Sequence, residues 1–294
     1  MSAALPWRHL LLALAVVSVW GTNFVVIKVG LRDLPPLLFA ALRFTMALVP
    51  AVFFLPRPSV PRKNLALYGL LIGVGQFGLL YVAMNGRISA GLASLVIQIQ
   101  VFFTIGLSIW LTRERVRKFQ WLALLLAALG ILEIGVHTDG ATTTGGLVLV
   151  LLAALAWAGG NMAAIQANPS SMLAYVVWSS AYCIAPLLVL AFLVEGRDAT
   201  LAGLHRATWT TWAAVAWQGW GNTLFGYAAW GWLLARHPAA TIAPMALLVP
   251  VFGLGASALW LQESLPAWKL LATALVMAGL AVNLLWPRLR AALA

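Results

Sequence analysis

Long runs of apolar residues, separated by short polar segments, follow one another along the whole chain. Each run is about 18–24 residues long, close to the length that an α-helix needs to cross the ~30 Å hydrocarbon core of a bilayer. The pattern predicts an all-α integral membrane protein. Its ten transmembrane helices are expected over residues 10–30, 36–55, 65–85, 90–111, 119–136, 145–166, 173–194, 211–234, 239–261 and 268–287.

The pattern repeats in the two halves of the chain. In each half an apolar run ends on Trp-Leu, a single glutamate follows, and the next run carries a glycine; these residues are Trp110, Leu111, Glu114 and Gly130, then Trp260, Leu261, Glu263 and Gly279. Both pairs, of glutamates and of glycines, have the same separation in sequence. Five helices per half is an odd number, so the second half should insert upside down, as in many transporters. We expect two inverted five-helix repeats, 1–136 and 145–294, joined by the loop 137–144, with extra residues of the second repeat in a loop at 195–209.

Composition agrees with a membrane location. The chain is 63% hydrophobic and 9% charged, which a soluble domain of this length could not bury, so the lipid bilayer must replace part of the core. The net charge of +11 does not indicate nucleic-acid binding, because no water-exposed module carries a basic run. With the N-terminus inside, eleven of the eighteen Lys and Arg residues fall on the cytoplasmic side and five on the other, which favours both termini in the cytoplasm.

These residues carry a family resemblance. Each half resembles the EamA-like domain of the drug/metabolite transporter superfamily, through Trp20-Gly-Thr-Asn-Phe in the first helix, Pro36 and Arg43 in the second, and the repeated Trp-Leu turn that is followed by a glutamate. The length and the Trp- and Tyr-rich middle helices are most similar to YddG-type aromatic amino acid exporters. The resemblance implies a multi-pass protein of the bacterial inner membrane that exports amino acids.

Polar and aromatic residues deep in the apolar runs are candidates for a binding site, because a polar group facing lipid is costly. In the eighth helix the tryptophan and tyrosine spacing of three and seven places the rings on one α-helical face. Rings suit an aromatic ligand body, and amides can bind an ammonium or a carboxylate. The same residues could instead be packing or interhelical contacts. The candidate substrate-binding residues are Gln76, Tyr81, Gln98, Gln100, Trp157, Asn161, Trp217, Trp220, Asn222, Tyr227 and Trp230, with Asn23 a further polar position.

Ionisable residues inside the runs are few. By depth, Arg43 or Lys28 can pair with Glu133, and a structural pair is favoured over capture of a substrate carboxylate. Glu114 and Glu263 are expected to cap helix turns. Gly75 and Gly78 are expected to allow close helix approach or a bend, and Pro244 and Pro250 to bend the ninth helix, whose counterpart in the fourth lacks proline.

The leading hypothesis is a secondary transporter that exports aromatic and other neutral amino acids by alternating access. Proton antiport and facilitated export along the substrate gradient both fit the sequence. The alternatives are a multidrug or lipophilic-metabolite exporter, or a channel or membrane scaffold. An enzyme is disfavoured because no HExxH motif, paired intramembrane aspartates or Ser-His arrangement is present. No metal or cofactor is predicted, and a monomer fits the pattern.

Overall fold

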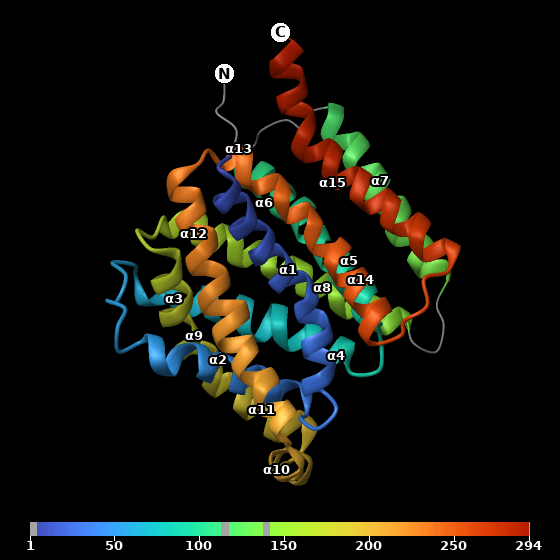
Figure 1. The fold of residues 1–294 in the computed structure, drawn as a ribbon. Helices are drawn as coiled ribbons and strands as arrows, with labels where there is room; N and C mark the ends of the chain where they lie inside the picture. The colour runs from blue at the N-terminus through green and yellow to red at the C-terminus, as the bar shows by residue number, and fades with distance from the viewer. Residues whose placement is uncertain (1–4, 113–117, 138–141, 294) are drawn as a thin grey trace.

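The computed structural model describes residues 5–112, 118–137 and 142–293, and its regular elements are helices (Figure 1). In the first half they are α1 (Trp7–Gly30), α2 (Pro36–Ala51), α3 (Arg62–Gly69), η1 (Leu70–Gly78), α4 (Leu79–Met84), α5 (Ala90–Val96), η2 (Ile97–Ile99), α6 (Gln100–Thr112) and α7 (Lys118–Val136). In the second half they are α8 (Thr144–Ala167), α9 (Met172–Leu190), η3 (Ala191–Glu195), α10 (Arg197–Arg206), α11 (Trp209–Ala216), η4 (Trp217–Phe225), α12 (Gly226–Arg236), α13 (Ala239–Ile242), η5 (Ala243–Leu247), α14 (Leu248–Trp260) and α15 (Ala267–Leu293).

Most of the ten expected membrane helices are confirmed by length and composition. Eight helical stretches in the described part of the chain are long and apolar enough to span a bilayer. The expected second span is a 16-residue apolar helix, Pro36–Ala51, that ends four residues before the expected boundary. The expected eighth span, formed by α11, η4 and α12, is helical throughout but is not among these eight. The protein is therefore all-helical, with eight to ten candidate spans.

Local sequence explains where several helices begin. The Ser89, Thr143 and Ser171 hydroxyls each accept a hydrogen bond from the backbone N–H three residues later, which caps α5, α8 and α9. The segment 195–209 was expected to be a loop, but it contains the ten-residue helix α10. Gly196, with φ of 90°, provides the sharp turn before α10 in a backbone region that other residues rarely adopt.

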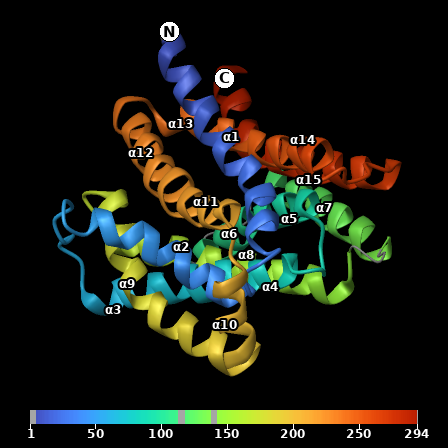
Figure 2. The same cartoon turned by 60° about the horizontal axis from the view of Figure 1, so that its bottom comes forward.

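The helices form two crossing groups. Figure 2 shows α1, α12, α14 and α15 above α2, α3, α4 and α9, and the two chain termini lie close together. We call the end of the molecule that carries the termini the terminus end. The opposite end contains the α1–α2 and α4–α5 turns and α10.

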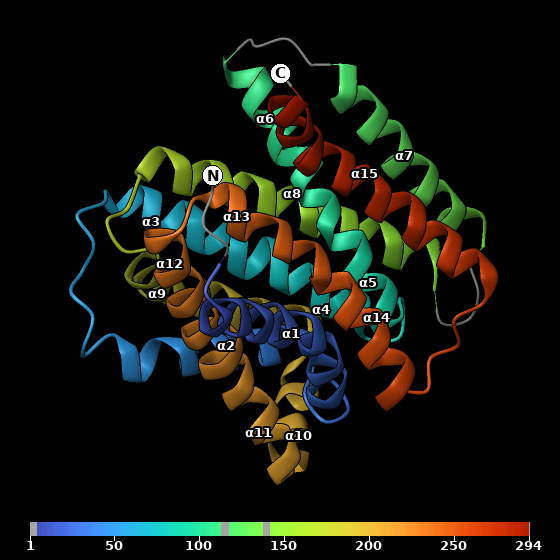
Figure 3. The same cartoon turned by 45° about the horizontal axis from the view of Figure 1, so that its top comes forward.

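Two helices form a pair at one side of the molecule. Figures 1 and 3 both show α7 and α15 running side by side. A Cβ atom added at Gly130 would lie 2.6 Å from Val276 Cγ2, and one at Gly279 would lie 2.6 Å from the Ala123 carbonyl oxygen. The repeated glycines thus let the two helices approach closely, as small residues do in membrane helix pairs.

Interruptions of α-helix occur at corresponding places in the two halves. The π-helix η1 lies in the third helical stretch and the π-helix η4 in the eighth, while the 3₁₀ segments η2 and η5 lie in the fourth and ninth. The ninth helix, in which the prolines predict a bend, contains η5, and the fourth helix is interrupted as well. Its segment, Ile97–Ile99, contains no proline.

Candidate functional site

A cavity of about 500 Å³ lies between the two groups of helices. Its walls come from the first, third, fourth, sixth, seventh, eighth, ninth and tenth helical stretches. Most of the predicted site residues line it: Gln76, Gln98, Gln100, Trp157, Asn161, Asn222, Tyr227 and Trp230. Residues far apart in the sequence therefore meet around one space. Toward the terminus end the lining continues to Leu234, Ala243 and Leu284.

Three predicted residues lie elsewhere. Tyr81 is fully buried outside the cavity, while Trp217 and Trp220 are 41% and 48% exposed on the outer surface. The Trp220 indole Nε1 donates to the Met46 carbonyl oxygen at 3.0 Å. The expected stripe is broken because η4 is a π-helix, which has more residues per turn than an α-helix. Side chains beyond it, including Tyr227 and Trp230, are rotated away from the face that Trp217 and Trp220 share.

An aromatic wall includes a residue that the sequence reasoning did not assign to the site. The Trp20 ring lies 6.0 Å from Tyr227 and 5.2 Å from Trp230, between ring centroids. Its Nε1 donates to the Asn222 carbonyl oxygen at 3.1 Å, which joins α1 to η4. We define the aromatic wall as Trp20, Tyr227 and Trp230. Trp20 belongs to the repeated signature of the first helix, so the repeat itself was the available signal.

Other lining residues were also missed. Tyr68, Phe77 and Asn283 face the cavity, and the Tyr68 ring packs 4.6 Å from Tyr175. Tyr68 lies before the π-helix η1 and Gln76 lies within it. α-Helical spacing therefore does not show that the two side chains face the same cavity. Asn283 lies in α15, whose middle part forms a side of the cavity.

Amide side chains occupy several cavity positions. Asn161 Nδ2 donates to Gln100 Oε1 at 2.9 Å and to Thr104 Oγ1 at 3.2 Å, which ties α8 to α6. In the described part of the chain, Gln76 and Gln98 line the cavity without a side-chain hydrogen bond to protein. These two amides are therefore available to a bound molecule.

A buried polar chain leads away from the cavity. Arg43, 1% exposed, donates through Nη1 to the Tyr81 hydroxyl at 3.2 Å and through Nη2 to Thr223 Oγ1 at 2.9 Å. The Tyr81 hydroxyl donates to Gln218 Oε1 at 3.0 Å, and Gln218 Nε2 donates to Asn23 Oδ1 at 2.7 Å. Asn23 itself lines the cavity.

The expected ion pair between Arg43 or Lys28 and Glu133 is wrong. Arg43 bonds to hydroxyl groups, and the Lys28 amine donates to the Met84 carbonyl oxygen at 2.7 Å. Glu133 instead approaches His137, one helical turn away, with its Oε1 3.3 Å from the ring Nδ1. Similar depth in the membrane did not place these side chains together, because Arg43 and Glu133 lie on helices that are not neighbours.

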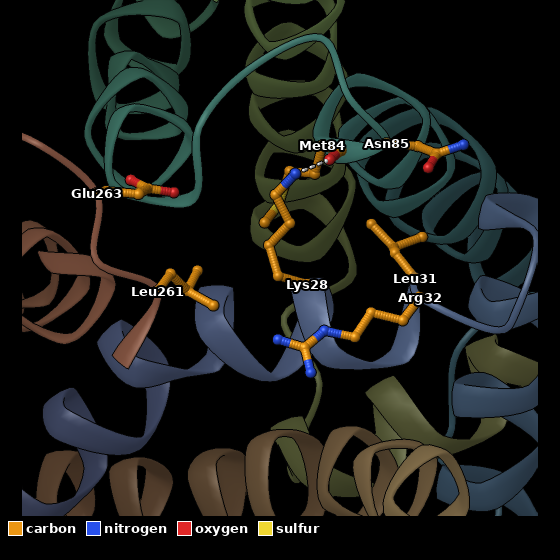
Figure 4. A pocket seen from close by; sticks show the side chains of 7 residues that line it. All are labelled: Lys28, Leu31, Arg32, Met84, Asn85, Leu261 and Glu263. Atoms are coloured by element: carbon orange, nitrogen blue, oxygen red, sulfur yellow. Dashed lines mark hydrogen bonds between the residues drawn. The ribbon is translucent and has the colours of Figure 1, made fainter. Parts of the chain in front are cut away.

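A smaller pocket of about 350 Å³ lies at the opposite end, beside the last turn of α1. Figure 4 shows Lys28 reaching toward Met84, with Glu263 across the pocket. Glu263 accepts backbone N–H bonds from Ala90 at 2.8 Å and Gly91 at 3.1 Å, so it caps α5. The expected capping role of Glu263 is thus confirmed, although the capped helix is in the other half. Glu114 lies outside the described residues.

Two further carboxylates bind the starts of distant helices at this end. Glu195 accepts from the Leu37 and Leu38 backbone N–H groups at 2.6 and 3.3 Å, at the start of α2. Asp33 accepts from the Thr208 and Thr211 hydroxyls beside α11. The hydrogen bond from Thr211 lowers the pKa of the Asp33 carboxyl below its ordinary value, so this group is ionised at neutral pH.

The predicted hinge residues have distinct surroundings. A Cβ at Gly75 would lie 2.7 Å from Ala156 Cβ, so this glycine allows α8 to pack closely against η1, whereas Gly78 has ordinary contacts with Leu37 and Leu187. Pro244 lies in η5, and Pro250 is the third residue of α14. A helix's first N–H groups lack intrahelical partners, so Pro250 does not break the helix; the interruption is η5 itself.

Comparison with known proteins places the chain in a family. The profile of the EamA-like transporter family matches residues 7–136 and 144–285, and the chain belongs to this family of membrane transporters. Proteins named probable amino-acid metabolite efflux pump are 42% identical in Salmonella typhimurium strain LT2 and 40% in Escherichia coli strain K12. These alignments cover 95% of this chain and 95% of the Salmonella protein, and 96% of each chain for Escherichia coli.

A solved crystal structure has the same fold. It shares 17% sequence identity with this chain, superposes with a TM-score of 0.62, and the match covers 97% of this chain and 99% of the other. The protein is thus a multi-pass membrane transporter with the drug/metabolite transporter fold.

Proposed function

We propose that this protein is an amino-acid metabolite efflux pump of the bacterial inner membrane that prefers substrates with an aromatic side chain. The observation that carries the proposal is the cavity lining: the aromatic wall on one side, unpaired amides on the other, and no charged side chain among the described lining residues. The similar pumps of Salmonella and Escherichia coli give the substrate class.

The lining fits a zwitterion with an apolar body. A free amino acid carries no net charge, so neutral amides can bind both its ends without a fixed counter-ion. The rings of Trp20, Tyr227 and Trp230 offer offset or edge contacts, each adding about 0.5–1.5 kcal/mol beyond the burial of area. A lipophilic cation would instead favour a carboxylate in the cavity. The described lining has none, which favours amino acids over the alternative multidrug substrate.

The direction of export is inferred from the similar efflux pumps, and the charge bias and the shape of the cavity support loading from the cytoplasm. The excess of Lys and Arg on the terminus side supports a cytoplasmic location of both termini. The cavity extends toward this end, which supports a conformation in which the protein binds substrate from the cytoplasm. Inverted repeats with matching interruptions, η1 with η4 and η2 with η5, then provide two sets of elements for opening the other side.

Counterflow in proteoliposomes tests this function. Vesicles preloaded with unlabelled L-tryptophan should accumulate labelled L-tryptophan and L-phenylalanine through the purified protein, and labelled L-threonine less. Exchange of this kind requires alternating access. A channel would equilibrate the label without accumulation, and a scaffold would move none, so either result would reject the proposal. Accumulation of lipophilic cations with no amino-acid exchange would favour the multidrug alternative.

Two variants test the aromatic preference. Tyr227→Ala removes part of the aromatic wall and should weaken apparent affinity for L-tryptophan by about tenfold, the loss expected from one large buried ring contact, while L-threonine changes little. Trp217→Ala is the matched control, because this ring is 41% exposed on the outer face of the same helical stretch. Equal losses for both substrates in Tyr227→Ala would contradict a role in recognising the ring.

A further inference from the structure

The buried Arg43 guanidinium has no carboxylate partner among the described residues. It contacts two aromatic faces, with its Cζ 5.0 Å from the Phe44 centroid and 3.7 Å from the Phe77 centroid, and its Nε has no hydrogen-bond partner. A buried cation without a counter-ion is costly, and its field is only weakly screened in a low-dielectric interior. Phe77 also lines the cavity, so one ring separates the charge from the space where a substrate would bind.

The Arg43 charge fixes the direction of the hydrogen-bond chain. Arginine can only donate, so the Tyr81 oxygen accepts from Nη1 and its own proton points to Gln218 Oε1. Gln218 must then present its amide nitrogen to the next residue, where it donates to Asn23 Oδ1. Because this oxygen is already used as an acceptor, Asn23 is left with its Nδ2 donors. These donors have no protein partner in the described chain, and Asn23 lines the cavity.

We propose that Asn23 Nδ2 forms a carboxylate-binding subsite, whose donors are oriented by Arg43 through Tyr81 and Gln218. The ligand class is the α-carboxylate of an amino acid. This inference rests on the proposed function and adds how the polar head is bound. Asn23 touches the substrate, while Arg43, Tyr81 and Gln218 are positioning residues. The arrangement stabilises an anion without placing a cation in the cavity, so a zwitterion is not trapped by a full ion pair.

The test compares two ligands that differ only in the carboxylate. L-Tryptophan and tryptamine share the indole ring and the amine, and equilibrium binding of both is measured on the full-length purified protein. Asn23→Asp replaces the donors with a second acceptor, so L-tryptophan should bind about tenfold or more weakly, while tryptamine binds as well as before or better. Tryptamine binding also shows that this variant is folded.

A second variant tests the positioning chain. Tyr81→Phe keeps the ring but removes the hydroxyl that links Arg43 to Gln218 by hydrogen bonds. Binding of L-tryptophan should weaken several-fold, while the affinity for tryptamine should stay the same. Tyr175→Phe is the matched control: Tyr175 is also fully buried, and its hydroxyl donates to Asn64 Oδ1 at 2.6 Å, outside the chain that leads to Asn23. It should leave the ratio of the two affinities unchanged.

The outcomes separate the two proposals. If the wild-type protein binds L-tryptophan and both Asn23→Asp and Tyr81→Phe retain its preference over tryptamine, the subsite is wrong and the proposed function stands. If the wild type binds no amino acid, the proposed function fails and the subsite fails with it. If Asn23→Asp binds neither ligand, Tyr81→Phe decides: a selective loss of L-tryptophan supports the subsite, and an unchanged preference overturns it.

Discussion

The two ends of this molecule are held together by different chemistry. At the opposite end charged side chains bind distant helices: Lys28 binds the Met84 carbonyl, and Glu195 and Glu263 bind the N-termini of α2 and α5. Among the described residues at the terminus end, the side-chain hydrogen bonds between distant helices join neutral groups, as between Asn64 and Tyr175. Charge-assisted hydrogen bonds are about twice as strong as neutral ones, and carboxylates suit the positive end of a helix dipole.

The two ends also differ in their relation to the cavity. The described lining of the cavity extends toward the terminus end, where neutral contacts lie beside it, and includes neither Lys28 nor the carboxylates of the opposite end. For the cavity to open to the other side, bonds such as those of Glu263 with Ala90 and Gly91 must break. The charged contacts are therefore expected to set the balance between the two states of the transporter.

The largest expected effect concerns which compartment each end faces. Asp198→Cys lies in α10 at the opposite end, and Lys63→Cys lies at the start of α3 at the terminus end; both positions are exposed. In intact cells a membrane-impermeant maleimide should label the first and spare the second, since a charged reagent does not cross the bilayer. The one native cysteine, Cys183, is buried and gives a low background. The reverse labelling pattern would invert the proposed topology.

Removing the Glu263 cap should have the next largest effect. Glu263→Ala leaves the Ala90 and Gly91 N–H groups without their acceptor, which destabilises the closed state by about 1–3 kcal/mol for each unsatisfied group. The ratio of closed to open molecules should therefore fall on the order of tenfold or more. Spin labels at Arg87 and Leu265 should report a longer distance in this variant by double electron–electron resonance. Glu133→Ala is the control, because in the described chain the Glu133 carboxylate pairs with His137, which lies just after the end of the same helix. Identical distance distributions in the two variants would show that the cap does not hold this end closed.

Lys28→Met should act in the same direction but more weakly. Methionine keeps an unbranched apolar stem but cannot make the hydrogen bond to the Met84 carbonyl. The loss of this one bond should lower the ratio of closed to open molecules by about a few-fold. The same pair of spin labels measures it. A shift as large as that of Glu263→Ala would mean that Lys28, rather than the helix cap, carries the closure.

Asp33→Asn should have the smallest effect. Asn retains an acceptor oxygen for Thr208 and Thr211, and the site is only partly buried, so the lost charge contributes about 1 kcal/mol or less. Transport should remain within about two- to fourfold of the wild type in the counterflow assay. A complete loss would place Asp33 in the transport mechanism itself.

Much of the fold could be predicted because apolar length and the internal repeat are properties of the chain alone. The glycines Gly130 and Gly279, for instance, mark the contact of α7 with α15. The helix α10 was missed because its sequence, from Arg197 to Arg206, is short and polar and has no membrane-length run.

The site was predicted less completely, for a geometric reason. Residues on separate helices met in the cavity, as Gln100 and Asn161 do, because polar groups avoid lipid. Within one helix, the assumption of α-helical spacing failed at η4, so Trp217 and Trp220 were placed on the wrong face. Arg43 was assigned to an ion pair because depth alone cannot show that hydroxyl groups of Tyr81 and Thr223 surround it.

The central claim is that an amino acid enters this cavity from the terminus end. The most direct test is to label Asn283→Cys, a cavity position in α15, with an impermeant maleimide in inside-out and right-side-out membrane vesicles. We expect rapid labelling in inside-out vesicles, where the cytoplasmic face is exposed, and protection by L-tryptophan. Labelling only in right-side-out vesicles, or no protection at saturating L-tryptophan, would contradict the account.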